Sequence, residues 1–415
     1  MKTLLFSFLF LSSAYAEMTV TEEMLTQHVN ENPIVSSFQE RLTAAEKLKG
    51  SLNRSFLPKV LLSYGKEKYS VGPYDNVIQP SGGIEASINV FNSGKDFIES
   101  ERRNREANIA DIDSSLSRAS ISVEVRKAMS QFAFLEELKI VLLEALEVNE
   151  KNIKGASRRV GAGLATNTDI LDFKQQKVML NQELENLEYD KEVVLRLIAT
   201  LLGHDPKDQI TVQFANSHPE HTAPEQLAPI HPGNSLLMKR AELLGEVAKL
   251  DMKSASRWWT PSMDVYAHAL RFMQKDREYP TSGQRNETAI GFRFTMPIFD
   301  GGEGIKVAQA KEAIAKSQEA LAKAKQLEID RETQNVLKKL DLAHRLIHGA
   351  EENVSIMMDY RKGILSEYER GVKNSPDVLQ ASQRWIEAKT KFAEVKKNYQ
   401  FARADAMYLI SLNKK

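Results

Sequence analysis

The 415-residue sequence contains no cysteine, no excess of charge of either sign and, beyond its first residues, no long apolar run. The absence of cysteine excludes disulfide bonds, thiolate metal sites, cysteine nucleophiles and a lipid-modified N-terminal cysteine. The 56 Lys and Arg residues balance 56 Asp and Glu residues, so we expect no nucleic-acid partner. Aromatic residues make up only 7% of the chain, which is typical of narrow apolar stripes rather than one thick core.

The first sixteen residues have the pattern of a secretory signal peptide. Lys2 precedes an apolar run over residues 4–11, and the small residues at 14–16 (AYA) fit a cleavage site. The run is about half of the roughly 20 residues that a membrane-spanning helix needs. We therefore expect residues 1–16 to be removed. The mature chain is then exported without a transmembrane helix, so it is periplasmic, secreted or held in the outer membrane by β-strands.

The mature chain contains an internal repeat. VFNSG at 90–94 resembles IFDGG at 298–302, and GLATNTDIL at 163–171 resembles GVKNSPDVL at 371–379. Both pairs have the same offset, because 302 − 94 and 371 − 163 are each 208. We predict a first structural repeat over 17–208, a linker over 209–230 and a second repeat over 231–415.

Two long helices are predicted within each repeat. The segments between the glycine landmarks contain no proline, and their apolar residues step by alternating 3 and 4, which is typical of helices that pack in pairs. The stripes predict helices over about 94–160 and 302–370, each followed by a second helix over about 168–202 and 376–411. Thr168 and the Ser375-Pro376 pair are predicted to start these second helices.

Before each long helix lie a shorter helix and two strand candidates. Alternating apolar and polar residues predict strands over about 58–69, 82–92, 261–272 and 288–299. Loops rich in Gly, Pro, Asn and Ser separate them over about 69–82 and 273–287. Each strand taken alone fits a small soluble hairpin as well as it fits a water-filled transmembrane barrel. Export and the twofold repeat favour the barrel, and because four strands cannot close a pore, several chains must contribute.

At this point the residues resemble those of a known family. A glycine and a small apolar residue precede Asp169-Ile170-Leu171 and Asp377-Val378-Leu379, and Phe91-Asn92-Ser93-Gly94 and Phe299-Asp300-Gly301-Gly302 match the motif at the end of the second strand. Each motif alone is weak, but both occur twice at one offset. Over essentially all of its mature length, the chain resembles the TolC-like outer membrane efflux proteins, or outer membrane factors.

The resemblance implies a mainly α fold with a β-barrel portion. Three copies would form a homotrimer in which long antiparallel coiled-coil helices build a periplasmic α-barrel and four strands per chain build a 12-stranded transmembrane β-barrel. Such a protein lies in the outer membrane of a Gram-negative bacterium, contacts its lipid and extends into the periplasm. It would serve as a passive exit duct for efflux or type I secretion, with a periplasmic adaptor (membrane fusion protein) and an inner membrane transporter of the RND or ABC type.

The resemblance also implies two sites. The turns between paired helices would be the tips that contact the adaptor, and these comprise Gly163, Leu164, Ala165, Thr166, Gly371, Val372, Lys373, Asn374 and Ser375. Glycines also end helices in most helical hairpins, so turn geometry explains part of this pattern. A periplasmic gate is expected just before the second tip, with Asp359, Glu367, Tyr368 and Glu369 as candidates. The alternative is that each of these charged residues lies on a solvent-exposed helix face and has no gating role.

No catalytic, metal or cofactor site is predicted. His344 and His348 are spaced i, i+4, but no carboxylate or cysteine completes a metal site, and His218, Glu220 and His221 lie in the predicted linker. No catalytic triad, phosphate loop or carboxylate pair is apparent, so we expect that the protein is not an enzyme. The alternative function is a soluble periplasmic coiled-coil scaffold. The sequence does not distinguish drugs, metals and proteins as the substrate.

Overall fold

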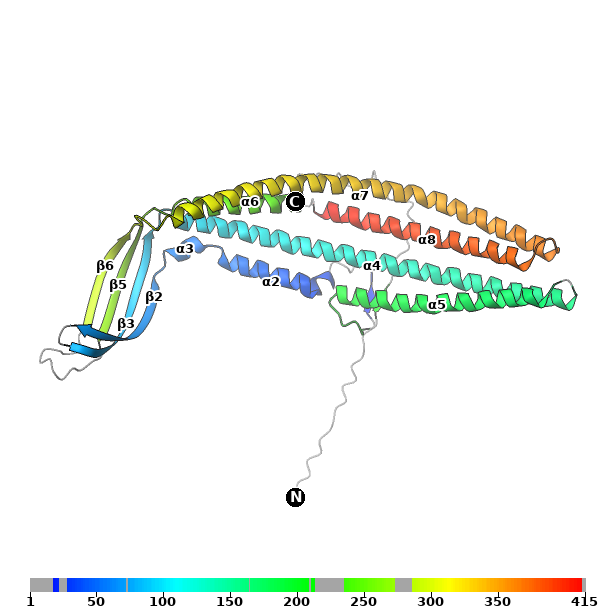
Figure 1. Ribbon diagram of the computed structural model, residues 1–415, viewed down its shortest axis with the longest axis horizontal. Coiled ribbons are helices and arrows are strands. Elements are labelled where there is room, and N and C mark those ends of the chain that lie inside the picture. Colours follow the sequence, from blue (N-terminus) through cyan, green and yellow to red (C-terminus); the bar gives the residue numbers. More distant parts are fainter. Residues whose placement is uncertain are drawn as a thin grey trace, which may run out of the picture. The chain divides into compact units, whose positions relative to one another are not determined.

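The computed structural model describes residues 18–21, 28–71, 74–163, 165–208, 210–212, 235–272 and 286–412 (Figure 1). The predicted signal peptide, Leu164, most of the predicted linker and most of the predicted loop at 273–287 lie outside these residues. No helix of the described part is long and apolar enough to cross a membrane. The chain divides into two compact units. The first comprises Met1–Phe38, Ser114–Leu236 and Leu327–Lys415, and the second comprises Gln39–Asp113 and Leu237–Gln326.

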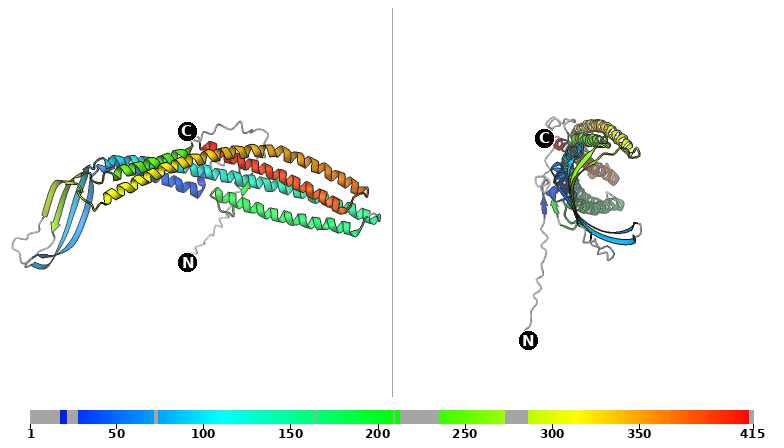
Figure 2. Two further views of the ribbon diagram at one scale, coloured as in Figure 1. Left: turned by 45° about the horizontal axis from the view of Figure 1, so that its top comes forward. Right: turned by 90° about the vertical axis from the view of Figure 1, so that its left-hand side faces the viewer.

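The second unit contains a four-stranded antiparallel sheet (Figures 1 and 2). Its strands are β2 (Lys59–Val71), β3 (Tyr74–Phe91), β5 (Ser262–Phe272) and β6 (Asn286–Thr295), in the order β2-β3-β5-β6. Each sequence repeat supplies one hairpin, and β3 pairs with β5 from Ser81 opposite Phe272 to Phe91 opposite Met263. The sheet therefore joins the two repeats.

The strand register gathers apolar side chains on one face of the sheet. Val60 is opposite Ala86, Ala86 is opposite Ala267, and Ala267 is opposite Ile290, so these four residues form one row across all four strands. Strand residues two apart share a face, and the neighbouring rows add Leu62, Ile84, Ile88, Val265, Phe292 and Phe294. Val60 is 65% exposed and Ile290 is 83% exposed in the isolated chain. The apolar face therefore has no cover among the residues that the structure describes.

Two strand ends differ from the sequence prediction. β6 ends at Thr295 rather than near 299, because Pro297 has no N–H to donate to a partner strand. β3 begins at Tyr74, inside the segment 69–82 that was predicted as a loop. Pro80 lies opposite Lys66 of β2, and pairing with β5 starts one residue later, so the proline lies where β3 has only one partner strand.

Along the chain, helices precede and follow the strands of this sheet. α3 (Ser51–Ser55) precedes β2, and α6 (Leu236–Ala255) precedes β5. Three helices have several residues in each unit: α2 (Pro33–Leu48), α4 (Lys95–Gly161) and α7 (Glu303–Glu369). α6 belongs to the second unit except for its first residue, Leu236. Within the second unit, ion pairs connect α6 to its neighbours. Glu246 accepts from Arg105 of α4 at 2.9 Å, and Asp251 accepts from Lys311 of α7 at 2.9 Å.

The first unit consists mainly of two helical hairpins, in which α5 (Asn167–Leu201) follows α4 and α8 (Ser375–Ser411) follows α7. α4 and α7 are each one uninterrupted helix of 67 residues. The predicted 3-4 stripes form the seams. Leu340, Ala343 and Ile347 of α7 pack against the α8 residues Tyr399, Ala402 and Ala406. The alanines allow close approach of the helix backbones.

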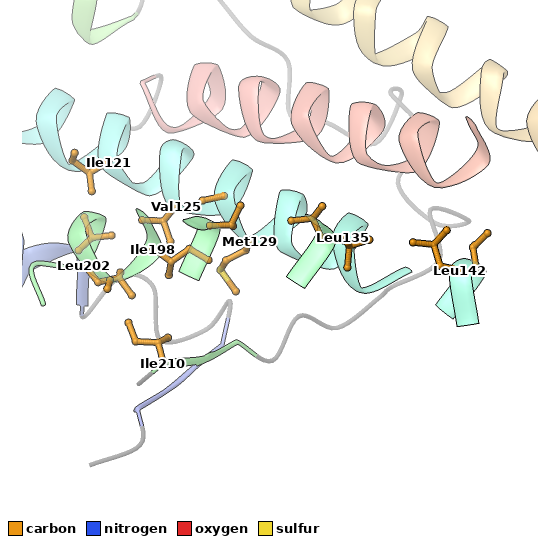
Figure 3. Packing of buried hydrophobic residues seen from close by; sticks show 14 of the residues in the cluster. Ile121, Val125, Met129, Leu135, Leu142, Ile198, Leu202 and Ile210 are labelled. Atoms are coloured by element: carbon orange, nitrogen blue, oxygen red, sulfur yellow. The ribbon is translucent and has the colours of Figure 1, made fainter. Parts of the chain in front are cut away.

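The largest apolar cluster of the first unit lies between α4 and α5 (Figure 3). Val125 and Met129 of α4 pack with Ile198 of α5 and with Leu202, and all four are fully buried. A two-stranded parallel sheet, β1 (Met18–Val20) with β4 (Ile210–Val212), adds Ile210 to the cluster. β4 falls within the segment that was predicted as a linker. A three-residue strand is too short to show an alternating pattern in the sequence.

Candidate partner-binding turns of the first unit

The turn between α4 and α5 is closed by backbone hydrogen bonds. Beyond the end of α4, Ala162 N donates to Arg158 O at 3.1 Å, and Gly163 N donates to Val160 O at 3.0 Å. Gly163 has a φ of 73°, which side chains rarely allow, so a glycine is required here. A Cβ at this position would have no atom within 4 Å, so the outer side of the turn is open.

The turn between α7 and α8 repeats this arrangement. Gly371 has a φ of 81°, and the next residue, Val372, donates its N–H to Glu367 O at 2.9 Å. Asn374 then caps α8: its side chain accepts from Asp377 N at 3.1 Å, and its own N–H donates to the Asp377 carboxylate at 3.2 Å. Such reciprocal capping satisfies two N–H groups that the helix itself leaves without partners.

α5 has an equivalent cap 208 residues earlier, in which Thr166 N donates to Asp169 Oδ2 at 2.9 Å. The helices therefore begin at Asn167 and Ser375, with Thr166 and Asn374 as caps. Thr168, which the sequence predicted as the start of α5, instead lies within it. Threonine at 166 and threonine at 168 fit the capping preference equally well, so the sequence alone did not separate them.

Side chains connect the two turns to each other. The buried Ser375 hydroxyl lies 2.5 Å from Asp169 Oδ1 and 2.9 Å from Asp172 Oδ2, both on α5. A hydroxyl has one hydrogen, so it donates to one of these carboxylates at a time. In the other direction, the Arg159 guanidinium of α4 donates to the Tyr368 carbonyl and lies 4.2 Å above the Tyr368 ring. These contacts hold the end of one hairpin against the other.

An apolar cluster lies directly behind the turns. Ala156 and Phe173 of the first hairpin pack with Ile364 and Tyr368 of α7 and with Val378 and Ala381 of α8. The Phe173 and Tyr368 rings meet edge to face with their centroids 6.2 Å apart, an arrangement that aromatic pairs favour. The buried Asn149 side chain donates to Phe173 O at 2.8 Å. The two turns therefore share one buried apolar cluster.

Burial and hydrogen bonding shift two pKa values at this site. Partial burial acts to raise the pKa of Asp169, but hydrogen bonds from Ser375 and Thr166 outweigh it and hold the pKa below its ordinary value. Burial raises the pKa of Tyr368, although the nearby Arg159 charge opposes the rise. Asp169 is therefore stabilised as a carboxylate, and Tyr368 as a neutral phenol.

The predicted tip residues differ in how far they are accessible. Gly163, Thr166, Gly371, Val372 and Asn374 are exposed, Ala165 and Lys373 are half-buried, and Ser375 is buried. Val372 is apolar and 70% exposed. Ser375 therefore contributes to the support of the turn rather than to its outer surface.

The candidate gate residues are spread over different environments. The Asp359 side chain is exposed and lies 3.6 Å from the Lys362 ammonium group. Glu369 is exposed and Glu367 is half-buried, and the carbonyl of Glu367 closes the turn. Tyr368 is buried in the cluster that joins the hairpins. Tyr368 is the gate candidate that makes contacts across both hairpins.

Sequence reasoning missed Arg159 and Asp172 as parts of this site. Neither belongs to a motif, and both resemble ordinary charged residues on a helix face. The repeat contains one usable signal: Arg159 aligns with Glu367 at the offset of 208, so the two turns carry different charges at equivalent positions.

Comparisons with known proteins now assign the family. The sequence matches the family described as outer membrane efflux protein over residues 25–204 and 233–408. No curated protein sequence matches the chain.

Several solved structures share the fold. The outer membrane protein VceC from Vibrio cholerae has a TM-score of 0.78 at 17% identity, with 95% of this chain and 97% of that chain covered. The CmeC outer membrane channel of Campylobacter jejuni has a TM-score of 0.79 at 14% identity, with 95% and 86% covered. A membrane protein from Pseudomonas aeruginosa has a TM-score of 0.80 at 16% identity, with 94% and 90% covered. The fold is TolC-like, as predicted, and the chain belongs to the outer membrane efflux protein family.

Proposed function

We propose that three copies of this chain form the outer membrane channel of a tripartite efflux or type I secretion system. Substrates would leave through it passively, delivered by an inner membrane transporter of the RND or ABC type through a periplasmic adaptor. Family membership supports the channel class. The observation that carries the proposal is the apolar face of the four-stranded sheet, which is exposed along all four strands. Lipid is the natural cover for such a face.

The edges of the sheet support a trimer. In the part of the chain that the structure describes, β2 and β6 each pair with a strand on one side only, so the other side of each has a row of backbone N–H and C=O groups without partners in the sheet. Within a membrane every backbone polar group needs a hydrogen bond, and an open sheet edge is therefore not stable there. Pairing β6 of one copy with β2 of the next satisfies both edges. Three copies of a four-stranded sheet close a barrel of twelve strands.

The turns are suited to binding an adaptor. At Gly163 and Gly371 the backbone is accessible because these residues have no side chain. Val372, next to Gly371, adds an exposed apolar side chain. Small residues allow the backbone of a partner helix to approach closely. The contacts among Ser375, Asp169 and the apolar cluster hold this surface in place without using its outer atoms.

We place the gate at the same end of the hairpins, with Tyr368 as its central residue. Separation of the second hairpin from the first would break the Arg159–Tyr368 contact and expose the Tyr368 ring. Asp359, Glu367 and Glu369 lie on the same stretch of α7, where they would set the charge around the opening.

Membrane fractionation tests the channel. The mature protein should sediment with outer membranes, resist extraction at alkaline pH and require detergent, and chemical cross-linking should give a trimer. A fully soluble mature protein would overturn the proposal and favour the periplasmic scaffold.

Site-specific cross-linking tests the tips. Since the chain has no cysteine, a single Val372→Cys variant carrying a photoactivatable thiol reagent reports on one position. We expect it to cross-link the adaptor in cells that express the transporter. Lys316→Cys on α7, with a similarly exposed side chain, is the matched control. Equal adaptor cross-linking at both positions, or at neither, would argue against the tips as the adaptor site.

A further inference from the structure

Two histidines and a glutamate from distant parts of the sequence converge in the first unit. His28 directly precedes the 3₁₀ helix η1 (Val29–Glu31), and His204 follows α5 by three residues. Glu31 Oε2 lies 3.7 Å from His28 Nδ1 and 3.7 Å from His204 Nε2. One ligand atom from each of the three side chains lies within 4.8 Å of the others.

Backbone contacts fix this convergence. The buried Asn32 side chain donates to Leu201 O at 2.7 Å and accepts from Ile34 N at 2.8 Å, so it joins the start of α2 to the end of α5. Figure 1 shows these two helix ends next to each other. Gly203 has a φ of 84°, and a Cβ there would lie 2.6 Å from Glu31 O. The glycine therefore allows the chain after α5 to touch η1, which brings His204 beside Glu31.

Three of the four imidazole nitrogens lack hydrogen-bond partners within the described part of the chain. His28 Nδ1, His28 Nε2 and His204 Nε2 are buried, and none forms a hydrogen bond with the residues that the structure describes. Leaving a buried polar atom without a partner costs about 1–3 kcal/mol. The His28 side chain is only 14% exposed, whereas the Glu31 side chain is 52% exposed. Val29 and Leu202, close in the sequence to His28 and His204, are fully buried.

A fourth residue lies behind His204. Asp208 Oδ2 is 4.0 Å from His204 Nδ1, while the opposite nitrogen, Nε2, faces Glu31. A carboxylate on the far nitrogen of a histidine is the usual support for a metal-binding imidazole, because it fixes the tautomer and the ring orientation.

We propose that His28, Glu31 and His204 bind a divalent transition-metal ion, Zn²⁺ in the first instance, which connects the N-terminal segment to the end of α5. Two imidazoles and a carboxylate are a common zinc set, and water would complete a tetrahedron. Zinc–nitrogen bonds of about 2.0–2.1 Å place tetrahedral ligands about 3.3–3.5 Å apart. The two 3.7 Å separations from Glu31, and the His28–His204 separation of at most 4.8 Å, must shorten by side-chain rotation to reach this spacing.

This inference does not depend on transport. The alternative explanation of the same geometry is that the two histidines pack against Glu31 without a bound ion. The two explanations differ in whether chelator-stripped protein takes up zinc.

Zinc binding to the full mature chain in detergent, purified without a histidine tag, is the test. We expect titration calorimetry to show one Zn²⁺ per chain, and zinc to raise the melting temperature. His28→Ala and His204→Ala should abolish both effects, and Asp208→Asn should weaken binding about 10–100-fold. His348→Ala, which removes the exposed member of the His344–His348 pair on α7, is the matched control and should bind as the parent does.

If a histidine variant does not fold, X-ray absorption at the zinc edge tests the proposal by identifying the atoms bound to zinc. Measured on the His348→Ala protein, it should show two imidazole nitrogens and a carboxylate oxygen at about 2.0–2.2 Å. Absence of stoichiometric zinc in the parent would overturn the proposal. Binding that survives both His28→Ala and His204→Ala, or that is lost in His348→Ala, would also overturn it.

Discussion

Replacing Ser375 by alanine removes the hydroxyl that connects the two turns. Ser375 is 1% exposed, and its hydroxyl lies 2.5 Å from Asp169 and 2.9 Å from Asp172. The change leaves a cavity the size of one oxygen atom. It also removes the hydroxyl that donates a hydrogen bond to either the Asp169 or the Asp172 carboxylate. The cap of α8 does not use this hydroxyl, because Asn374 and Asp377 bond each other directly. The effect should therefore be confined to the contact between hairpins.

The structure sets the size of the effect. A hydrogen bond to a charged group is worth about 1.5–3 kcal/mol. Asp169 is only partly buried, and it also accepts from the Ser375 backbone N–H, which alanine retains. Both facts place the loss at the low end, at about 1–1.5 kcal/mol. Since 1.4 kcal/mol is a factor of ten, opening of the turns should become roughly tenfold more frequent.

Hydrogen exchange measured by mass spectrometry reports this opening. Peptides that cover residues 156–175 and 364–381 should exchange about tenfold faster in Ser375→Ala, while peptides from the sheet should not change. Ser157→Ala is the matched control, because the Ser157 hydroxyl donates to the Ile153 carbonyl of its own helix, at 2.9 Å, and to no other group among the described residues. Unchanged exchange in Ser375→Ala, or an equal increase in Ser157→Ala, would refute the assigned link between the turns.

Three further changes and one pH titration test other parts of the structure. Because the pKa of Asp169 is lowered on folding, its contribution to stability is present above about pH 4 and is lost as the pH falls through the folded pKa, so the protection of the turns from exchange, corrected for the intrinsic exchange rate at each pH, should fall in acid. Phe173→Ala should cost about 3–5 kcal/mol in chemical unfolding, because a fully buried ring leaves a cavity. Ile290→Lys should cost about 2–4 kcal/mol and reduce membrane assembly on gels, whereas Thr295→Lys on the other face of β6 should not. Gly203→Ala should lower the free energy of unfolding by at least the roughly 1–2 kcal/mol cost of a left-handed side chain, with a further cost from the contact with η1, and thermal unfolding should show a lower melting temperature.

The regular elements could be predicted because their signals are periodic and local. The 3-4 stripe that includes Phe173 predicts a helix whose apolar side is buried, and Phe173 is indeed fully buried. The alternation around Ile290 predicts a strand with one apolar face, and the register confirms that this face runs across the sheet. The segment at 69–82 was predicted wrongly as a loop, because glycine, serine and proline there outweighed the strand-forming residues Tyr74, Val77 and Ile78.

The candidate site was only partly predictable. Gly163 and Gly371 were found because a left-handed turn demands glycine, and the structure gives both a positive φ. Tyr368 was noticed for its place before the second turn, but its burial against Phe173 was not. That contact depends on how one hairpin packs on the other, and no local pattern in either hairpin encodes it.

The sequence by itself determined the repeat, the long helices, the glycine turns and the apolar face of the strands. These follow from the backbone periods of helix and strand and from the conformations open to glycine. The tertiary structure alone decided which polar and aromatic side chains meet: Ser375 with Asp169, Arg159 with Tyr368, and His28 with His204. The partners in these contacts come from segments far apart in the chain. Only the packing of helices and turns brings them within hydrogen-bonding or metal-binding distance.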